Sequence, residues 1–225
     1  MPDGSLPQIG GDPTVAPLAF DSFASRDAIL VAAARQHDDA LEIHSWVGGS
    51  VKAKVERFSD LIGVALDEPD SPLLARSPTE IYVLAERRAP DAPPNPRDRV
   101  WREEQDPSRH DAMVILRRDG AAWARTVIDA SAAYGMALAR DEGLWLLPVD
   151  HVDRPASILR VHRSGAQERY ELPEALIAHQ STEVQPLSLF ANADGSLLML
   201  GGWGQGLHAT TGLFKVRIRA ASGGK

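Results

Sequence analysis

The chain has 225 residues, no cysteine and a formal net charge of −7, with 24 basic and 31 acidic residues. The missing cysteines exclude disulfides, thiolate metal sites and cysteine nucleophiles. The negative charge repels phosphate backbones and anionic lipids, so we expect neither nucleic acid nor a membrane as a partner. Residues 1–5 show no signal peptide. The protein as written is therefore expected in the cytoplasm, or outside the cell if a signal peptide was removed.

A hairpin pattern recurs four times along the chain. Each copy has a short apolar stretch rich in small residues, a polar turn and a stronger apolar run. Recurrence of one sheet-forming unit predicts a repeat architecture. The copies are Pro17–Phe20 with Ala28–Val31, Ile62–Leu66 with Ile81–Leu84, Tyr134–Leu138 with Leu144–Leu147, and Pro186–Phe190 with Leu197–Leu200.

A third strand is expected after each hairpin and a fourth strand after three of them. Turn signals such as Asp119-Gly120 and Ser164-Gly165 separate the third and fourth strands. The last copy lacks a fourth strand, so we expect residues 1–16 to supply it, with Ser5–Ile9 as the closing strand. The third strands are 40–46, 112–116, 157–161 and 213–218, and the fourth strands are 51–58, 122–128 and 167–172.

Two segments also fit helices. Ser77-Pro78-Thr79-Glu80 has the form of a capping box with proline at the first helical position. The alanine-rich stretch 25–43 fits an amphipathic helix. Against these alternatives, Ile81-Tyr82-Val83 favours a strand, because β-branched and aromatic residues fit a pleated surface.

The repeat resembles β-propeller repeat proteins. Gly63, Ala65, Gly135 and Ala137 suit the crowded innermost strand of a propeller blade. The segment Asp119–Trp123 is similar to the Asp-box of sialidase-like propellers, although its spacing is one residue short and the other units lack the Asp–Trp pair. The resemblance implies an all-β, β-propeller-like domain over residues 1–225, with about four blades of four antiparallel strands. It implies no activity, because propellers host unrelated functions.

One histidine falls in each predicted connection between second and third strands. Three of these histidines lie beside an aspartate. Imidazoles and carboxylates that converge on a ring axis can bind a divalent metal or transfer protons. The alternative is that polar surface connections simply favour histidine and aspartate. The four histidines are His37, His110, His151 and His208.

The connection at 87–110 is a long insertion with five prolines. Such insertions are usually functional or disordered. It carries Trp101 between Arg99 and Arg102, a combination enriched at interface hot spots. Trp203 lies in a glycine-rich segment that lacks phosphate-loop spacing. We hypothesise that these four residues contact a partner. The alternative is a surface insertion whose tryptophan covers a blade edge.

The sequence favours a non-enzymatic binding module without a cofactor. It would recognise a protein or another macromolecule through the face that bears the connections, and it would form a homodimer if the ring is open. The alternative is a propeller-fold lyase or hydrolase that uses the His/Asp cluster with one bound divalent cation. The two hypotheses differ in the expected metal content.

Overall fold

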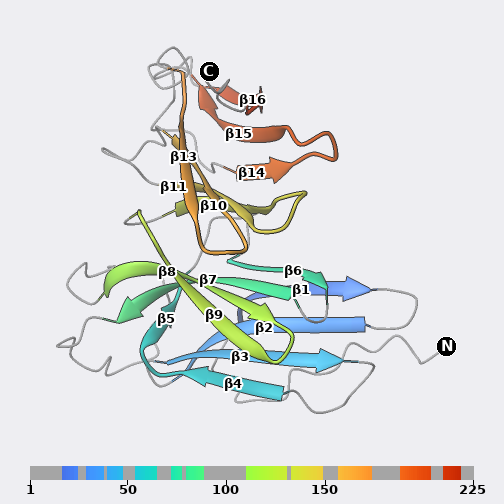
Figure 1. Cartoon of the computed structure of the whole chain (residues 1–225), viewed down its shortest axis with the longest axis vertical. Coiled ribbons are helices and arrows are strands. Elements are labelled where there is room, and N and C mark those ends of the chain that lie inside the picture. Colours follow the sequence, from blue (N-terminus) through green and yellow to red (C-terminus); the bar gives the residue numbers. More distant parts are fainter. Residues whose placement is uncertain are drawn as a thin grey trace. The chain divides into compact units, whose positions relative to one another are not determined.

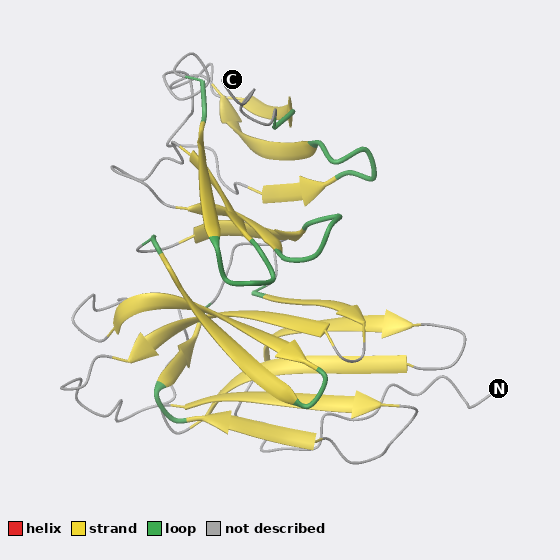
Figure 2. Ribbon diagram, viewed as in Figure 1, coloured by secondary structure: helices red, strands yellow, loops and turns green. Residues whose placement is uncertain are grey.

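The protein is described by a computed structural model, which covers residues 17–24, 29–37, 40–47, 54–64, 72–77, 80–88, 110–130, 133–148, 157–173, 188–203 and 210–218. These residues form sixteen strands and no helix (Figure 2). The all-β prediction is confirmed. The described part of the chain contains no helix that could span a membrane.

The strands form four separate antiparallel sheets, each made of segments that are close in sequence (Figure 1). The first sheet has the order β1-β2-β3-β4, the third has the order β10-β11-β12-β13, and the fourth has the order β14-β15-β16. The second sheet has five strands. The bounds in the first two sheets are β1 Pro17–Ala24, β2 Ile29–His37, β3 Ala40–Val47, β4 Lys54–Phe58, β5 Leu61–Gly63, β6 Leu73–Ser77, β7 Glu80–Arg88, β8 His110–Asp119 and β9 Ala122–Ile128. In the other two they are β10 Ala133–Leu138, β11 Leu144–Pro148, β12 Ser157–Val161, β13 Gln167–Glu171, β14 Ser188–Ala191, β15 Leu197–Trp203 and β16 Thr210–Val216.

Both helix alternatives are wrong. β2 and β3 occupy the alanine-rich stretch and pair directly, from Leu30 opposite Val47 to His37 opposite Ala40. The predicted capping box connects two strands, since Ser77 of β6 lies opposite Glu80 of β7. Local helix signals are weak when the flanking residues can bury an apolar face in a sheet.

The second sheet departs from the expected four strands. β5 pairs with the end of β7, and β6 pairs with its beginning. The other edge of β7 is taken by β8. Two short strands therefore lie one after the other along a single edge of β7, where the sequence predicted one strand over 62–66. The closing strand predicted within 1–16 lies outside the described residues.

The chain divides into two compact units, and each is described here by itself. The first unit holds the first and second sheets, which pack on each other through β1 with β6 and through β3 with β5. Its core is a cluster of aliphatic side chains from both sheets, with Phe58 and Trp123 at its margin. The cluster members are Leu41, Ile43, Leu61, Leu73, Ala75, Ile81, Val83, Ala85, Val114 and Leu116.

The second unit holds the third and fourth sheets, whose first strands β10 and β14 pack against each other. One face of each sheet contributes to the shared core. The buried members are Ala137, Leu147, Ile158, Leu172, Leu189, Leu197 and Met199. Trp145, Phe214, Val216 and Ile218 pack against them and are partly buried.

Three hairpins of the second unit use similar five-residue turns. In all three the first residue donates its N–H to the carbonyl of the fifth: Ala139 to Gly143, His162 to Ala166 and Asn192 to Ser196. The fourth residue must adopt positive φ, which glycine tolerates best. Gly165 and Gly195 fill that position. Glycine-bearing polar turns between apolar runs were therefore a reliable hairpin signal.

Candidate functional site

The structure places the backbone of three of the predicted site residues. His37 is the last residue of β2, His110 is the first of β8, and Trp203 is the last of β15. Each is a terminal strand residue beside the connection in which the sequence predicted it, and their role in a site stays a prediction. Their side chains are not described. The remaining five predicted residues, Arg99, Trp101, Arg102, His151 and His208, lie outside the described residues.

Metal binding by the predicted histidines stays a prediction. Among the residues that the structure does describe, no group of three or more His, Asp or Glu side chains is arranged to hold a metal ion. Of the other described histidines, His44 lies 3.1 Å from the Glu42 carboxylate, and His162 lies 3.4 Å from that of Glu168. A single carboxylate beside a histidine does not make a metal site.

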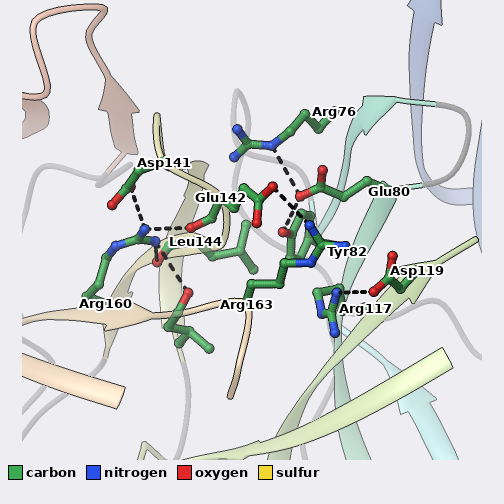
Figure 3. A network of polar contacts seen from close by, with 11 residues as sticks. Arg76, Glu80, Tyr82, Arg117, Asp119, Asp141, Glu142, Leu144, Arg160 and Arg163 are labelled. Carbon is green, nitrogen blue, oxygen red and sulfur yellow. Dashed lines mark hydrogen bonds and ion pairs between the residues drawn. The ribbon is translucent and has the colours of Figure 1, made fainter. Parts of the chain in front are cut away.

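The second unit has a buried cationic side chain in its third sheet. The Arg160 side chain is only 3% exposed. Its guanidinium donates to the carbonyls of Leu144 at 3.0 Å and Glu142 at 2.6 Å, and to the Asp141 carboxylate at 2.6 Å (Figure 3). It also lies 5.0 Å from the ring of Trp145. These bonds fix the β10–β11 turn, so the role of Arg160 is structural.

The β10–β11 turn is backbone-strained. Glu142 has φ of +71° and is followed by Gly143 with φ of +94°. A Cβ atom on Gly143 would lie 2.3 Å from the carbonyl oxygen of Val161. The Glu142 carboxylate accepts a hydrogen bond from Arg163 at 2.9 Å. The bonds from Arg160 and Arg163 hold a conformation that an ordinary residue rarely adopts.

The first unit contains a comparable arginine, Arg118 of β8. It crosses from the second sheet to the first, where it donates to the Ser45 hydroxyl at 3.3 Å and lies 3.7 Å from the Glu56 carboxylate. Trp123 stands 6.0 Å from the guanidinium and contacts Phe58 edge-on. These side-chain contacts connect the first and second sheets within the first unit, and the role of this cluster is also structural.

Two further charged contacts of the first unit involve Glu80 and Asp60. Tyr82 donates to Glu80, and Arg76 lies 3.2 Å from the same carboxylate beside the β6–β7 turn (Figure 3). Arg125 of β9 binds Asp60 through two nitrogens, and this interaction holds the pKa of the Asp60 carboxyl below its usual range. These contacts stabilise turns and strand ends.

The outer face of the fourth sheet differs from these clusters because it exposes apolar side chains. Phe190 is 41% exposed and Leu213 is 62% exposed. Phe190 lies opposite Leu198, and Leu200 lies opposite Leu213, so the four residues occupy two neighbouring rungs of one face. Leu198 and Leu200 are partly buried. We call Phe190, Leu198, Leu200 and Leu213 the outer apolar patch.

A charged rim borders the outer apolar patch. Lys215 lies opposite Leu198 and forms an ion pair with Asp194 at 2.8 Å. The Lys215 ammonium and the Ser196 hydroxyl and N–H hold the pKa of Asp194 well below its usual range. Arg217, the first residue after the end of β16, is exposed. An apolar patch with a polar rim is the usual anatomy of a protein-binding surface.

The alternation of residues 213–218 in the sequence already indicates that Leu213 is exposed. Residues 213–218 alternate, with Phe214, Val216 and Ile218 on the buried side. That alternation puts Leu213 on the same side as Lys215 and Arg217, where a polar residue is expected. A single outward leucine is ordinary, and it is informative here only because it adjoins Phe190, Leu198 and Leu200 in one patch.

Comparison with known proteins gives no relative. No family model, no curated protein and no solved structure matches the chain.

Proposed function

We propose that this protein is a non-enzymatic binding module that recognises another protein through the outer apolar patch. The observation that carries the proposal is the exposure of Phe190 and Leu213 on one face of the fourth sheet. Removing the apolar surface of leucine and phenylalanine side chains from water is favourable by about 25 cal/mol for each Å² buried. A partner surface that covers the patch gains this free energy.

The proposal also includes the partner contacts that the sequence predicts. Trp203 ends β15, the central strand of the sheet that carries the outer apolar patch. The insertion with Arg99, Trp101 and Arg102 supplies aromatic and basic groups of the kind that dominate binding energy at interfaces. We propose these residues as further partner contacts.

We also propose that the four sheets are the blades of a β-propeller-like fold. Three observations support this. Successive strands pair in chain order within the first, third and fourth sheets. The first strands β10 and β14 pack together in the second unit, and β1 packs against the edge strand β6 in the first. The second and third sheets are apolar on both faces. In the second sheet Leu84 and Met113 are buried on the face that points away from the core cluster of the first unit. In the third sheet Leu146 and Leu159 are buried on the face that points away from the core of the second unit. A propeller predicts one cooperative unfolding transition, whereas separate units predict two.

Affinity capture with matched variants tests the binding function. Leu213→Glu and Phe190→Glu each put a charge in the outer apolar patch. Val55→Glu is the control, because Val55 of β4 is 49% exposed in the first sheet. We expect the immobilised wild-type chain and the control to retain the same saturable protein and both patch variants to lose it, with all unfolding midpoints unchanged. Retention by the patch variants, or equal loss in the control, contradicts the proposal.

A further inference from the structure

Arg217, at the border of the outer apolar patch, is a charged side chain without a counter-ion. It lies between Val216 and Ile218, which pack against the core of the second unit, and is itself exposed. Among the residues that the structure describes, no acidic side chain pairs with Arg217. Its guanidinium can therefore bind a carboxylate that comes from outside the chain.

The other basic residue beside the patch is already paired. Lys215 Nζ lies 2.8 Å from Asp194 Oδ2. The second oxygen of the same carboxylate accepts hydrogen bonds from the Ser196 N–H at 3.0 Å and from its hydroxyl at 2.5 Å. Both oxygens of Asp194 are thus engaged, and this carboxylate leaves the charge of Arg217 uncompensated.

The sequence around the patch is basic although the chain is acidic. Residues 184–225 contain four basic residues and one acidic residue, Asp194. Their formal charge is therefore +3, whereas the whole chain carries −7. Salt limits interactions between exposed charges to about 8 Å at physiological ionic strength, so a bound partner responds to the charge beside it. A negative group next to the outer apolar patch is stabilised there.

We propose that the partner protein covers the outer apolar patch with an apolar side chain and places a carboxylate on Arg217. This inference rests on the proposed function and names the chemistry of its partner. Phe190 and Leu213 are the exposed side chains that the apolar group covers. A guanidinium binds a carboxylate through two parallel N–H donors, so Arg217 also orients the partner on the sheet.

A second copy of this chain is a poorer occupant of the patch. Two copies that met through this surface would cover their apolar side chains, but neither would offer a carboxylate to Arg217. Asp194 is the only acidic residue in the described part of the fourth sheet, and its oxygens are engaged. The two whole chains would also repel each other, because each has a net charge of −7. A different protein with a carboxylate beside an apolar side chain satisfies both requirements.

Three small molecules with the same apolar part serve as probes for the charge preference. Phenylhexanoate carries a carboxylate, phenylhexylamine carries an ammonium group, and phenylhexanol is uncharged. In each, the same flexible chain joins a phenyl ring to the polar group. Binding to the isotope-labelled full-length protein is measured from backbone amide chemical shifts during titration, at concentrations at which the probes do not aggregate.

We expect the wild-type chain to bind phenylhexanoate about fivefold more tightly than phenylhexylamine, because an ion pair with Arg217 replaces a like-charge contact. Phenylhexanol should bind with intermediate affinity, and the shifted amides should include those of Phe190 and Leu213. Arg217→Glu should reverse the order of the two charged probes. The control is Arg140→Glu, which changes the net charge equally at an exposed arginine of the second unit outside the fourth sheet, and it should keep the wild-type order.

The outcomes separate this inference from the proposed function. Equal affinity for the two charged probes, the wild-type order in Arg217→Glu, or unshifted amides at Phe190 and Leu213 overturns the carboxylate inference. The proposed function then still stands if Leu213→Glu abolishes partner capture, whereas retained capture by Leu213→Glu overturns both.

Two further measurements address other occupants of the patch. A sedimentation mass of two chains that falls to one in Leu213→Glu would assign the patch to a second copy. Binding of the wild-type chain, but not of Arg217→Glu, to phosphatidylserine vesicles would assign it to a membrane. Either result overturns the inference, and we expect a mass of one chain and no vesicle binding.

Discussion

The third and fourth sheets are built alike but are covered differently. Both contain five-residue hairpin turns with a residue of positive φ, at Gly165 in one and at Gly195 in the other. In the third sheet, Leu146 and Leu159 are buried on one face and Leu147 and Ile158 on the other. In the fourth sheet, one face is buried and the other exposes Phe190 and Leu213.

This difference separates stabilising residues from residues that are available for recognition. In the third sheet even the one charged residue of β12, Arg160, is buried and fully engaged. At the last strand of the fourth sheet, three side chains are exposed to solvent: Leu213, Lys215 and, just after the strand, Arg217. Substitutions in the third sheet should therefore change stability, and substitutions on the outer face of the fourth should change binding.

Two glycines with positive φ give the largest expected contrast. Gly143→Ala in the β10–β11 turn of the third sheet should lower the unfolding free energy by about 3 kcal/mol, because the strained φ is joined by a collision with the Val161 carbonyl. Gly195→Ala in the fourth sheet should cost about 1 kcal/mol, because its Cβ would meet open space and only the strain remains. Urea unfolding measures both, and equal losses would contradict the difference in packing.

Two leucines of the fourth sheet allow the same substitution on opposite faces. Leu189→Ala should cost about 3 kcal/mol, because it removes a buried side chain from the core of the second unit. Leu213→Ala should change the unfolding free energy by less than about 0.5 kcal/mol, because the side chain is exposed. If Leu213→Ala were as destabilising as Leu189→Ala, the outer apolar patch would be part of a core.

Two basic residues, one from each sheet, can be replaced by methionine. Arg160→Met should cost about 2 kcal/mol, because the Leu144 and Glu142 carbonyls lose their donors in a buried turn. Lys215→Met should have little effect on stability, because its ion pair with Asp194 is solvent-exposed. Thermal and urea unfolding of the two variants test this. A stable Arg160→Met protein would show that the turn does not depend on the guanidinium.

The smallest expected effect is a pH dependence of the fourth sheet. Because its pKa is lowered in the folded state, Asp194 stabilises the fold fully above the pKa of an unfolded-chain aspartate, about 3.9. That stabilisation is lost as the pH falls toward the lowered folded-state pKa. The unfolding free energy of the wild-type chain should therefore fall between about pH 5 and pH 2, and Asp194→Asn should fall less steeply. Parallel curves would show that the Lys215–Asp194 contact is absent in solution.

Most strands could be predicted from the sequence, because the apolar runs and glycine turns act locally. The strands of the third and fourth sheets lie within a few residues of the predicted ranges. β6 was missed because the residues between Leu66 and Ile81 were interpreted as the polar turn of the second hairpin, whereas Leu73 and Ala75 are buried opposite β7 and form a strand. Pairing between segments outweighs a local capping pattern when it buries apolar area.

The candidate site could be predicted only in part. Strand alternation assigns Leu213 and Phe190 to one face of a sheet, but it does not say whether another layer covers that face. For Arg160 the alternation pattern is wrong in the other direction. The pattern predicts that a charged residue of β12 faces solvent, but Arg160 is buried because its guanidinium donates to carbonyls of the β10–β11 turn. Exposure depends on contacts between segments far apart in sequence.

Hydrogen–deuterium exchange with and without the captured partner tests the central claim most directly, because a bound protein slows exchange of the backbone amides that it covers. The account predicts that the partner slows exchange in β14 and β16, which carry Phe190 and Leu213, and leaves β12 unchanged. Unchanged exchange in β14 and β16, or equal slowing in β12, would contradict the claim that the outer apolar patch is the recognition surface.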